Sequence, residues 1–259
     1  MNHLQNVILI IAKDIARLLE ENDIPFFLDG GTALGAVRHG GFIPWDDDFD
    51  IIILPEYYDK FVDVCRTKLN KEKYAFIEAE KDWPLHISKI KLKGTSIEEI
   101  DEFPMKEKGI YIDIFCFDYA SNLRPIRYLQ WLFTRLWVVL TIAEKPYTTN
   151  SFKKKFAISI AKIINTKFLR KFVRYLGRSH RKTKYLSMAW CRTRSNWKRY
   201  FCDRGIFDNV RMTRFENQEF PVPERFHDYL KICFGDYMVL PPVEKRVGLH
   251  VISVDYGKY

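Results

Sequence analysis

The pattern of hydrophobic and polar positions predicts helices and short strands in alternation along the first part of the chain. Apolar residues recur at helical spacing over residues 1–22, which predicts an amphipathic helix. Residues 25–28 form a short apolar run typical of a buried strand, and the glycine pair Gly30 and Gly31 then precedes a predicted helix over 33–39. We therefore expect a strand, a glycine turn and a helix in that order.

Four further segments have the short, apolar and β-branched character of strands. They are residues 49–54, 74–78, 86–92 and 109–115, and a helix is predicted over 56–69, directly after the first of them. Strands interleaved with helices predict a mixed α/β (α+β) core, in which a sheet is flanked by helices.

The middle of the chain predicts helices of a different character. Residues 126–142 are strongly hydrophobic, but Arg127 and Arg135 interrupt them, so the uncharged run is well short of the ~20 residues that a membrane span needs. Residues 152–176 predict an amphipathic helical region surrounded by lysine and arginine, with a break expected at Asn165–Thr166. We therefore expect a basic helical region and no transmembrane helix.

The tail, residues 220–259, is rich in proline and aromatic residues. It predicts irregular structure packed on the body, with a helix around 225–233. The expected organisation is a single domain over residues 1–259, in which 120–200 is a basic helical insertion and 201–259 is a C-terminal segment packed on the core.

Composition supports a folded protein. With 259 residues and 47% hydrophobic content the chain can bury a substantial core, which argues against disorder. The five cysteines are odd in number and form no CxxC pair, so neither a disulfide framework nor a zinc ribbon is indicated, and a reducing compartment fits best. The N-terminal helix lacks a basic leader and a small-residue cleavage site, so a cytoplasmic location is expected.

Charge is distributed unevenly along the chain. The net charge is +9, yet the segment 145–202 contains 17 lysines and arginines and no acidic residue. The remainder carries 25 basic and 33 acidic residues, so a mildly acidic body bears one strongly basic region. Two surfaces with different partners are therefore expected.

The segment from the glycine pair to a run of aspartates carries most of the chemical information. A glycine pair at a helix start lets the backbone approach an anion, and the free N–H groups of that helix favour phosphate, to which Thr32 can add a hydroxyl. Asp48 and Asp50 are two residues apart, so on an extended backbone both carboxylates project from one face. The segment thus predicts a phosphate site beside a pair of carboxylates.

Such closely spaced carboxylates predict a divalent cation. Hard carboxylate oxygens suit Mg²⁺ or Mn²⁺, with phosphate oxygens completing the coordination. Asp113, in the apolar middle of the strand 109–115, is the expected third carboxylate, either as a metal ligand or as the base that accepts a proton from an attacking hydroxyl. The alternatives are a solvated acidic or calcium-binding loop at 46–50, and an Asp113 that is only salt-bridged to a lysine in the core.

The string GGTALGAVRHGGFIPWDDDFDI, residues 30–51, resembles the signature of the LicD family, which is related to fukutin and fukutin-related protein within the nucleotidyltransferase superfamily. The strand with Asp113 and segments of the tail resemble the family too, so the likeness covers most of residues 20–118 and 200–246. The middle, about 120–200, carries no family motif. The resemblance implies a nucleotidyltransferase-like fold in which Asp48, Asp50 and Asp113 are the acidic residues of the superfamily pattern.

The resemblance also implies a reaction. Members of the family transfer a phospho-alcohol group, often phosphocholine, from a CDP-activated donor such as CDP-choline to a sugar hydroxyl of a bacterial surface glycan, and release CMP. In-line attack at the distal phosphorus would use Mg²⁺ held by Asp48 and Asp50, with Gly30, Gly31 and Thr32 cradling phosphate. Rival interpretations are a nucleotidyltransferase that releases pyrophosphate from a nucleoside triphosphate, a noncatalytic membrane or nucleic-acid binding module, and a structural calcium site.

Several residues near the signature have two interpretations each. Arg38 and His39 can contact donor phosphates, although Arg38 can equally cap its helix. Trp45 can stack on a base or bound a choline-like cation, and it can also be a core residue, as can Trp83. The lysines of the strand 86–92 can meet phosphate, but a solvated or salt-bridged face is expected.

The basic helical region has three interpretations. Its lysines and arginines can place it on the anionic inner face of the cytoplasmic membrane, near a lipid-linked glycan acceptor. It can equally pack its apolar face on the body of the protein. Nucleic acid is not expected as a partner, because the apolar face is too continuous for a purely electrostatic arm and no recognition motif is present.

Overall fold

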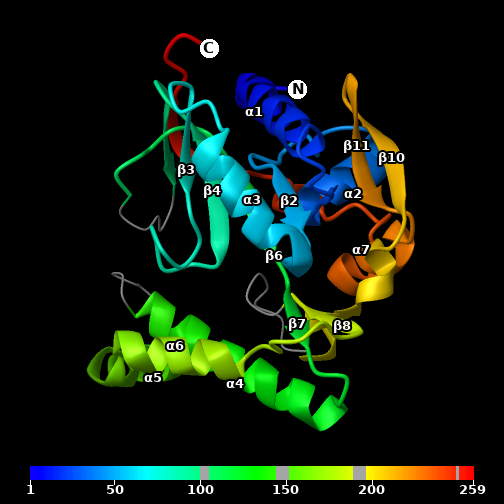
Figure 1. Ribbon diagram of the computed structural model, residues 1–259. Coiled ribbons are helices and arrows are strands. Elements are labelled where there is room, and N and C mark those ends of the chain that lie inside the picture. Colours follow the sequence, from blue (N-terminus) through cyan, green and yellow to red (C-terminus); the bar gives the residue numbers. More distant parts are fainter. Residues whose placement is uncertain (100–104, 144–151, 189–196, 249–250) are drawn as a thin grey trace. The chain divides into compact units, whose positions relative to one another are not determined.

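The computed structural model describes residues 1–99, 105–143, 152–188, 197–248 and 251–259 (Figure 1). Parts of the predicted basic segment, 145–151 and 189–196, therefore lie outside the described residues. The chain divides into two compact units, which we call the sheet unit, Met1–Cys116 with Ile206–Tyr259, and the helical unit, Phe117–Gly205. The helical unit spans nearly the same residues as the predicted insertion.

The sheet unit is built on a five-stranded mixed sheet. The pair β2–β6 is parallel and the other pairs are antiparallel, so the predicted mixed α+β architecture is confirmed. The strand order is β1 (Phe26–Leu28), β2 (Asp50–Ile53), β6 (Tyr111–Cys116), β4 (Ile87–Leu92) and β3 (Tyr74–Ile77).

Helices cover this sheet. α1 (His3–Glu20) contacts β6, and α3 (Pro55–Thr67) contacts β2 (Figure 1). α1 begins with a capping box, in which the side chains of Asn2 and Gln5 each accept a hydrogen bond from the other residue's backbone N–H group. α2 (Gly30–His39) packs on β1, β2 and α7 (Phe226–Phe234), so the C-terminal residues hold the helix that follows the glycine pair.

The tail contains more regular structure than we predicted. The hairpin of β10 (Val210–Phe215) and β11 (Gln218–Pro223) belongs to the sheet unit, and β12 (Val251–Asp255) pairs with β5 (Ser96–Glu99). The expectation of irregular structure is therefore wrong there, whereas the helix expected around 225–233 is confirmed as α7. The proline content of the tail favoured irregular structure over strands. Proline is nevertheless tolerated in strands of a two-stranded ribbon, because one edge of each strand needs no ladder hydrogen bonds.

Four aromatic rings tie this hairpin to the signature segment. Phe49 packs edge to face against Phe42, Phe215 and Phe220, with ring centroids 6.1, 5.4 and 5.4 Å away. Edge-to-face pairs of this kind add to the stabilisation that comes from burial. Because Phe49 is 1% exposed, it fixes the backbone on either side of it.

The helical unit has its own small core. Its helices are α4 (Arg124–Ile142), α5 (Phe152–Ile164) and α6 (Lys167–Leu176), so the break expected between the last two is confirmed. A three-stranded sheet of β7 (Asp118–Ala120), β8 (Tyr185–Ser187) and β9 (Phe201–Asp203) completes it, together with a 3₁₀ turn at Trp197–Tyr200. A second 3₁₀ turn, Arg204–Phe207, spans the boundary between the units, and a third, Val243–Lys245, lies in the sheet unit. Over the described parts of the chain, no helix combines the length and apolarity that crossing a membrane requires.

Candidate active site

Three charged residues form a row across neighbouring strands of the sheet. Asp50, at the start of β2, is the register partner of Asp113 in β6, and Asp113 is the register partner of Lys89 in β4. Register partners project from the same face of a sheet, with Cβ atoms about 5 Å apart. The strand pairing therefore brings the predicted carboxylates Asp50 and Asp113 together.

Lys89 is the principal partner of Asp113. Its Nζ lies 2.9 Å from Asp113 Oδ1, and the two side chains are only 6% and 14% exposed. The same Nζ lies 3.3 Å from the centroid of the Tyr111 ring, which adds a cation–π contact. The predicted salt bridge is thus present, but it is buried beside the aspartate cluster and is not part of a solvated face.

Asp48 belongs to the same cluster. Burial raises the pKa of Asp48 well above its ordinary value, and the negative charges of Asp46, Asp113 and Asp47 raise it further. Burial likewise raises the pKa of Asp50, followed by the charges of Asp48 and Asp113. These shifts mean that the predicted carboxylates are close enough to oppose one another's ionisation.

The pKa of Asp113 is raised as well, chiefly by burial, while the charge and hydrogen bond of Lys89 lower it. The negative charge of Asp113 therefore has a fixed counter-charge in Lys89. This balance distinguishes it from Asp48 and Asp50, whose pKa values are raised further above normal.

A second group of carboxylates overlaps with the predicted one. Asp46, Asp47 and Asp48 offer ligand oxygens that all lie within 4.8 Å of one another, a spacing that one metal ion can bridge. The sequence analysis assigned the metal to Asp48, Asp50 and Asp113, so only Asp48 is common to both groups. Each group supplies hard carboxylate oxygens, which fit Mg²⁺ or Mn²⁺.

The glycine pair lies directly against these carboxylates. Gly30 has φ +49°, and a Cβ added there would lie 3.2 Å from Asp50 Oδ2. A Cβ on Gly31 would lie 2.7 Å from Asp46 Oδ2, closer than real Cβ atoms approach. The predicted glycine turn and the predicted acidic cluster are therefore two sides of one site, and side chains at these positions would displace the carboxylates.

Thr32 connects the two sides. Its hydroxyl oxygen accepts a hydrogen bond of 2.9 Å from the backbone N–H of Asp50, which ties α2 to the start of β2. The hydroxyl proton remains able to point elsewhere, so the predicted phosphate contact and this structural role are compatible.

Asp29 is a positioning residue that the sequence analysis did not single out. Its carboxylate accepts a 2.6 Å hydrogen bond from the N–H of Gly30 and another from the hydroxyl of the fully buried Tyr229 in α7. Its backbone N–H donates to the carbonyl of Asp50 at 3.0 Å. Asp29 thus fixes the glycine turn relative to β2; its place as the residue before a glycine at a helix start was the available signal.

A basic and aromatic cluster lies at the other end of α2. Arg38 donates a 2.8 Å hydrogen bond to the carbonyl of Tyr237, and His39 meets Trp45 edge to face at 6.2 Å. The guanidinium of Arg246 lies 5.6 Å from the centroid of the Trp45 ring. The left-handed Gly40 ends α2 by capping it, so among the described hydrogen bonds Arg38 holds the tail and does not cap its own helix.

Burial lowers the pKa of Arg38, and the positive charge of Arg246 lowers it further. Burial and the charge of Arg38 lower the pKa of His39. Because these positive groups oppose one another's ionisation, the cluster is an attractive site for an anion. Its α2 members, Arg38 and His39, lie about 10 Å along the helix axis from the glycine pair. Trp83, by contrast, is a core residue whose indole N–H donates to the carbonyl of Ile87 at 2.6 Å.

Comparisons with known proteins identify a family and several relatives of this chain. Residues 23–139 match the family described as "LicD/FKTN/FKRP, nucleotidyltransferase domain". The chain is 26% identical over 252 residues to the lipopolysaccharide cholinephosphotransferase LicD of Haemophilus influenzae, which covers 95% of this chain and 94% of that protein.

Other relatives match shorter stretches of the chain. The ribitol 5-phosphate transferase FKRP of Homo sapiens is 44% identical over 45 residues, 17% of this chain and 9% of that protein. An uncharacterized protein of Rickettsia prowazekii is 52% identical over 46 residues, 18% of this chain and 17% of that one. The resemblance to the LicD family is thereby confirmed, and residues 23–139 match the nucleotidyltransferase domain of that family.

Proposed function

We propose that this protein transfers a phospho-alcohol group, phosphocholine first among the candidates, from a CDP-alcohol to a hydroxyl of a cell-surface glycan and releases CMP. Two relatives support the class of reaction, because one is named as a lipopolysaccharide cholinephosphotransferase and another as a ribitol 5-phosphate transferase. Both names describe transfer of an alcohol phosphate.

One observation carries the proposal: the glycine pair and the aspartates form a single site. A phosphate bound by the start of α2 would lie against the carboxylates of Asp46 and Asp50, since both lie within contact distance of where glycine lacks a side chain. Phosphate and carboxylate repel each other unless a cation lies between them. The arrangement therefore suits a phosphate substrate that arrives with a divalent metal ion.

The residues present fit such an ion. Asp48 and Asp50, whose raised pKa values reflect crowded negative charge, would be the ligands, together with either Asp113 or the Asp46–Asp47 pair. When bound, the metal would neutralise charge on the transferred phosphoryl group and orient it. Ionised carboxylates would then be favoured at neutral pH, as ligands require.

The remaining residues position the substrates. The glycine pair and Thr32 hold phosphate oxygens next to the aspartates, and the Arg38, His39, Trp45 and Arg246 cluster is placed to hold another part of the donor, whose pyrophosphate and base are an anion and an aromatic ring. Asp113 is the third ligand or the acceptor of the proton from the glycan hydroxyl. Its contact with Lys89 keeps the carboxylate fixed in one orientation.

The experiment is CMP release from a panel of CDP-alcohols, CDP-choline first, with Mg²⁺ and a mixed glycan extract. The wild-type chain should release CMP with at least one donor, and the Asp48→Asn protein should not, although its fold is intact by circular dichroism. Asp63→Asn provides a matched control, because Asp63 is exposed on α3 and none of the described contacts joins its carboxylate to the cluster, so activity should be retained. Pyrophosphate release from a nucleoside triphosphate in place of CMP would support the rival reaction.

A further inference from the structure

The helices α4, α5 and α6 expose apolar side chains although they already share a core. Trp137, Leu140, Ala161 and Val173 are buried together at their junction. Apolar residues outside that core therefore cannot be explained by packing within the helical unit. They have a different partner in the working protein or remain in contact with water.

On α5 and α6 the outward residues recur at helical spacing. Phe156, Ile160 and Ile163 follow one another at intervals of four and three residues on α5, and Ile163 is 83% exposed. On α6, Phe168 is 78% exposed and stacks on Phe172, one turn later, with a centroid distance of 6.3 Å. Each helix thus has an inward and an outward apolar face.

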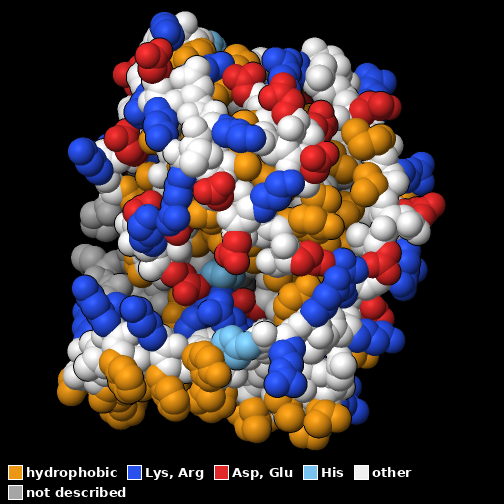
Figure 2. All heavy atoms as spheres, viewed as in Figure 1, with side chains coloured by type: hydrophobic (Ala, Val, Ile, Leu, Met, Phe, Trp, Pro, Cys, Tyr) orange, Lys and Arg blue, Asp and Glu red, His pale blue; other side chains and the backbone are white. Residues whose placement is uncertain are grey.

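The outward face of α4 continues this surface. Three of its leucines are each at least 40% exposed and recur at helical spacing, namely Leu129, Leu132 and Leu136. Leu136 shares an apolar groove of about 440 Å³ with Phe156 and Ile160 of α5, so the outward faces of these two helices meet. Figure 2 shows hydrophobic side chains gathered over the helices α4 to α6 of Figure 1, with lysine and arginine next to them.

Charge identifies the partner. The sequences of α4, α5 and α6 contain eleven lysines and arginines and no aspartate or glutamate, and of these Arg174 is buried in an ion pair with Asp118. A second copy of the same surface would bring like charges together, which disfavours a symmetric dimer. An anionic lipid bilayer matches both properties, because it accepts apolar side chains at its acyl boundary and attracts lysine and arginine at its headgroups.

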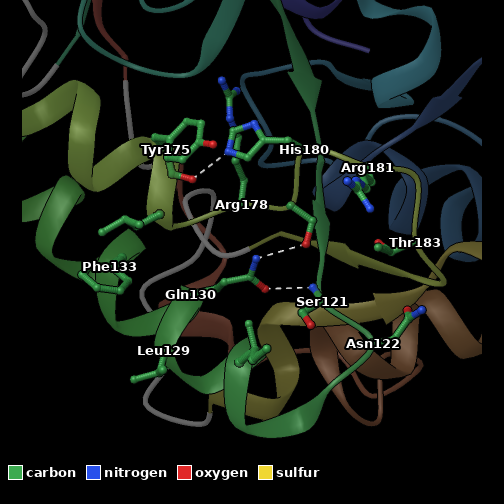
Figure 3. A pocket seen from close by; sticks show the side chains of 13 residues that line it. Ser121, Asn122, Leu129, Gln130, Phe133, Tyr175, Arg178, His180, Arg181 and Thr183 are labelled. Atoms are coloured by element: carbon green, nitrogen blue, oxygen red, sulfur yellow. Dashed lines mark hydrogen bonds between the residues drawn. The ribbon is translucent and has the colours of Figure 1, made fainter.

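A pocket at the end of this surface has the same mixture. It has a volume of about 610 Å³, and α4 contributes Ile126 and Leu129 while the segment after α6 contributes Arg178, His180 and Arg181 (Figure 3). No acidic residue is among its lining residues, all of which the structure describes. The apolar wall suits an acyl chain, and the cationic rim suits a phosphate.

Hydrogen bonds hold the rim of this pocket in place. Gln130 of α4 donates to Ser179 Oγ at 3.2 Å and accepts from the backbone N–H of Ser121 at 2.9 Å (Figure 3). The imidazole of His180 stacks on Tyr175 at 3.9 Å and lies within hydrogen-bond distance of its carbonyl oxygen. The rim is therefore formed within the helical unit before any ligand binds.

We propose that the exposed apolar and basic face of α4, α5 and α6 docks on an anionic membrane surface, with the pocket beside Arg178 and Arg181 receiving a lipid phosphate. This inference goes beyond the proposed reaction and does not depend on it. Of the three interpretations that the sequence allows for the basic helical region, we thereby favour peripheral contact with lipid.

The test is co-sedimentation of the full chain with vesicles of phosphatidylcholine alone or mixed with phosphatidylglycerol. Binding is expected only with the anionic vesicles and should weaken with added salt. Ile163→Ser and Phe168→Ser should each weaken binding roughly tenfold, the change that corresponds to one buried apolar side chain. Val243→Ser is the matched control, because Val243 is 72% exposed in the sheet unit and its replacement should leave vesicle binding unchanged.

Further variants test charge and the pocket. Lys167→Glu should weaken binding to anionic vesicles several-fold, since each surface cation contributes about 1 kcal/mol near such lipids. Arg181→Gln should also weaken vesicle binding when lipid phosphate is in excess over protein. Equal binding to both vesicle types, retained binding by the Ile163→Ser, Phe168→Ser double variant, or binding to RNA but not to vesicles would overturn the proposal.

Two measurements separate this inference from the proposed reaction. Asp48→Asn should bind anionic vesicles as the wild-type chain does. Loss of vesicle binding with CMP release intact would overturn docking alone, and vesicle binding without CMP release would overturn the proposed reaction alone. A dimer in solution that the same serine variants dissociate would replace the membrane with a second copy of the chain.

Discussion

Lys89 Nζ lies 2.9 Å from Asp113 Oδ1, and both residues are register partners in the middle of neighbouring strands. The pair places one cation at the edge of a cluster of five aspartates, which comprises Asp46, Asp47, Asp48, Asp50 and Asp113. Both side chains are largely buried, with 6% and 14% of their surfaces exposed. Removal of the pair therefore has consequences for both stability and catalysis.

Lys89→Met should lower the free energy of unfolding by about 3 kcal/mol, because it leaves the Asp113 carboxylate buried and unpaired. It should also raise the pKa of Asp113 further, since the lysine charge now lowers it. Urea unfolding measures the first effect. Combining it with Asp113→Asn should restore much of the stability without restoring CMP release; a double variant no more stable than Lys89→Met would show that the pair is not coupled.

Asp48→Asn should stabilise the metal-free protein at neutral pH. The folded pKa of Asp48 is raised well above its ordinary value of 3.8, so the folded state holds the proton more tightly than the unfolded chain does. Stability is therefore lost as the pH rises from the ordinary pKa towards the raised one, and each tenfold difference in proton affinity corresponds to about 1.4 kcal/mol.

Unfolding in EDTA at a series of pH values checks this. The variant should be more stable than the wild-type chain at neutral pH, and the two should converge as the pH falls to the ordinary aspartate range. A wild-type chain that is equally stable or more stable at neutral pH would contradict the crowding of charge at this site.

Mg²⁺ should stabilise the wild-type chain and shift its melting temperature upward in a concentration-dependent way, because only the folded state brings the carboxylates together. Asp48→Asn should abolish the shift. Comparing Asp46→Asn with Asp113→Asn distinguishes the two groups of ligands: the variant that abolishes the shift contains a ligand. A shift that both variants retain would leave neither group as the metal site.

Gly31→Ala should lower CMP release by at least about tenfold, since its Cβ would lie 2.7 Å from Asp46 Oδ2 and a misplaced catalytic group costs that much or more. Gly94→Ala is the control. Gly94 has φ +78° and no neighbour within 4 Å of an added Cβ, so that change should cost about 1 kcal/mol of stability and leave turnover unchanged. Equal activity of both variants would argue against close contact between the glycine turn and the carboxylates.

Trp45→Ala and Arg246→Ala should raise the KM for the donor and have a smaller effect on kcat, because the indole ring and the guanidinium that contacts it can bind the donor but supply no carboxylate to the aspartate cluster. Steady-state kinetics with the active CDP-alcohol checks this. A loss confined to kcat would instead place these residues at the reacting phosphorus, which is close in the chain because Trp45 directly precedes Asp46.

Much of the site could be predicted from the sequence because its parts are local. The glycine pair, Asp48 and Asp50 lie within about twenty residues, and the spacing of the two aspartates alone implies a shared face. The apolar strand around Asp113 showed that this carboxylate needs a partner.

The identity of that partner could not be predicted, since it depends on which strands pair and in what register. Lys89 was one of two lysines in its strand, and only the pairing of β4 with β6 places it on Asp113. Tyr229 and Arg246 lie about 200 residues from the groups they contact, beyond the reach of any local pattern. The strands of the tail were missed for a related reason, because proline disfavours strands in general but not in a two-stranded ribbon.

The measurement that tests the central claim most directly is ³¹P NMR of a reaction that contains CDP-choline, Mg²⁺ and the glycan extract. The account predicts that the donor pyrophosphate signals decay while a CMP monoester and a new glycan phosphodiester grow in equal amounts, and that Asp48→Asn shows none of these changes. Turnover that survives Asp48→Asn, or no phosphodiester with any CDP-alcohol while a nucleoside triphosphate yields pyrophosphate, would contradict it.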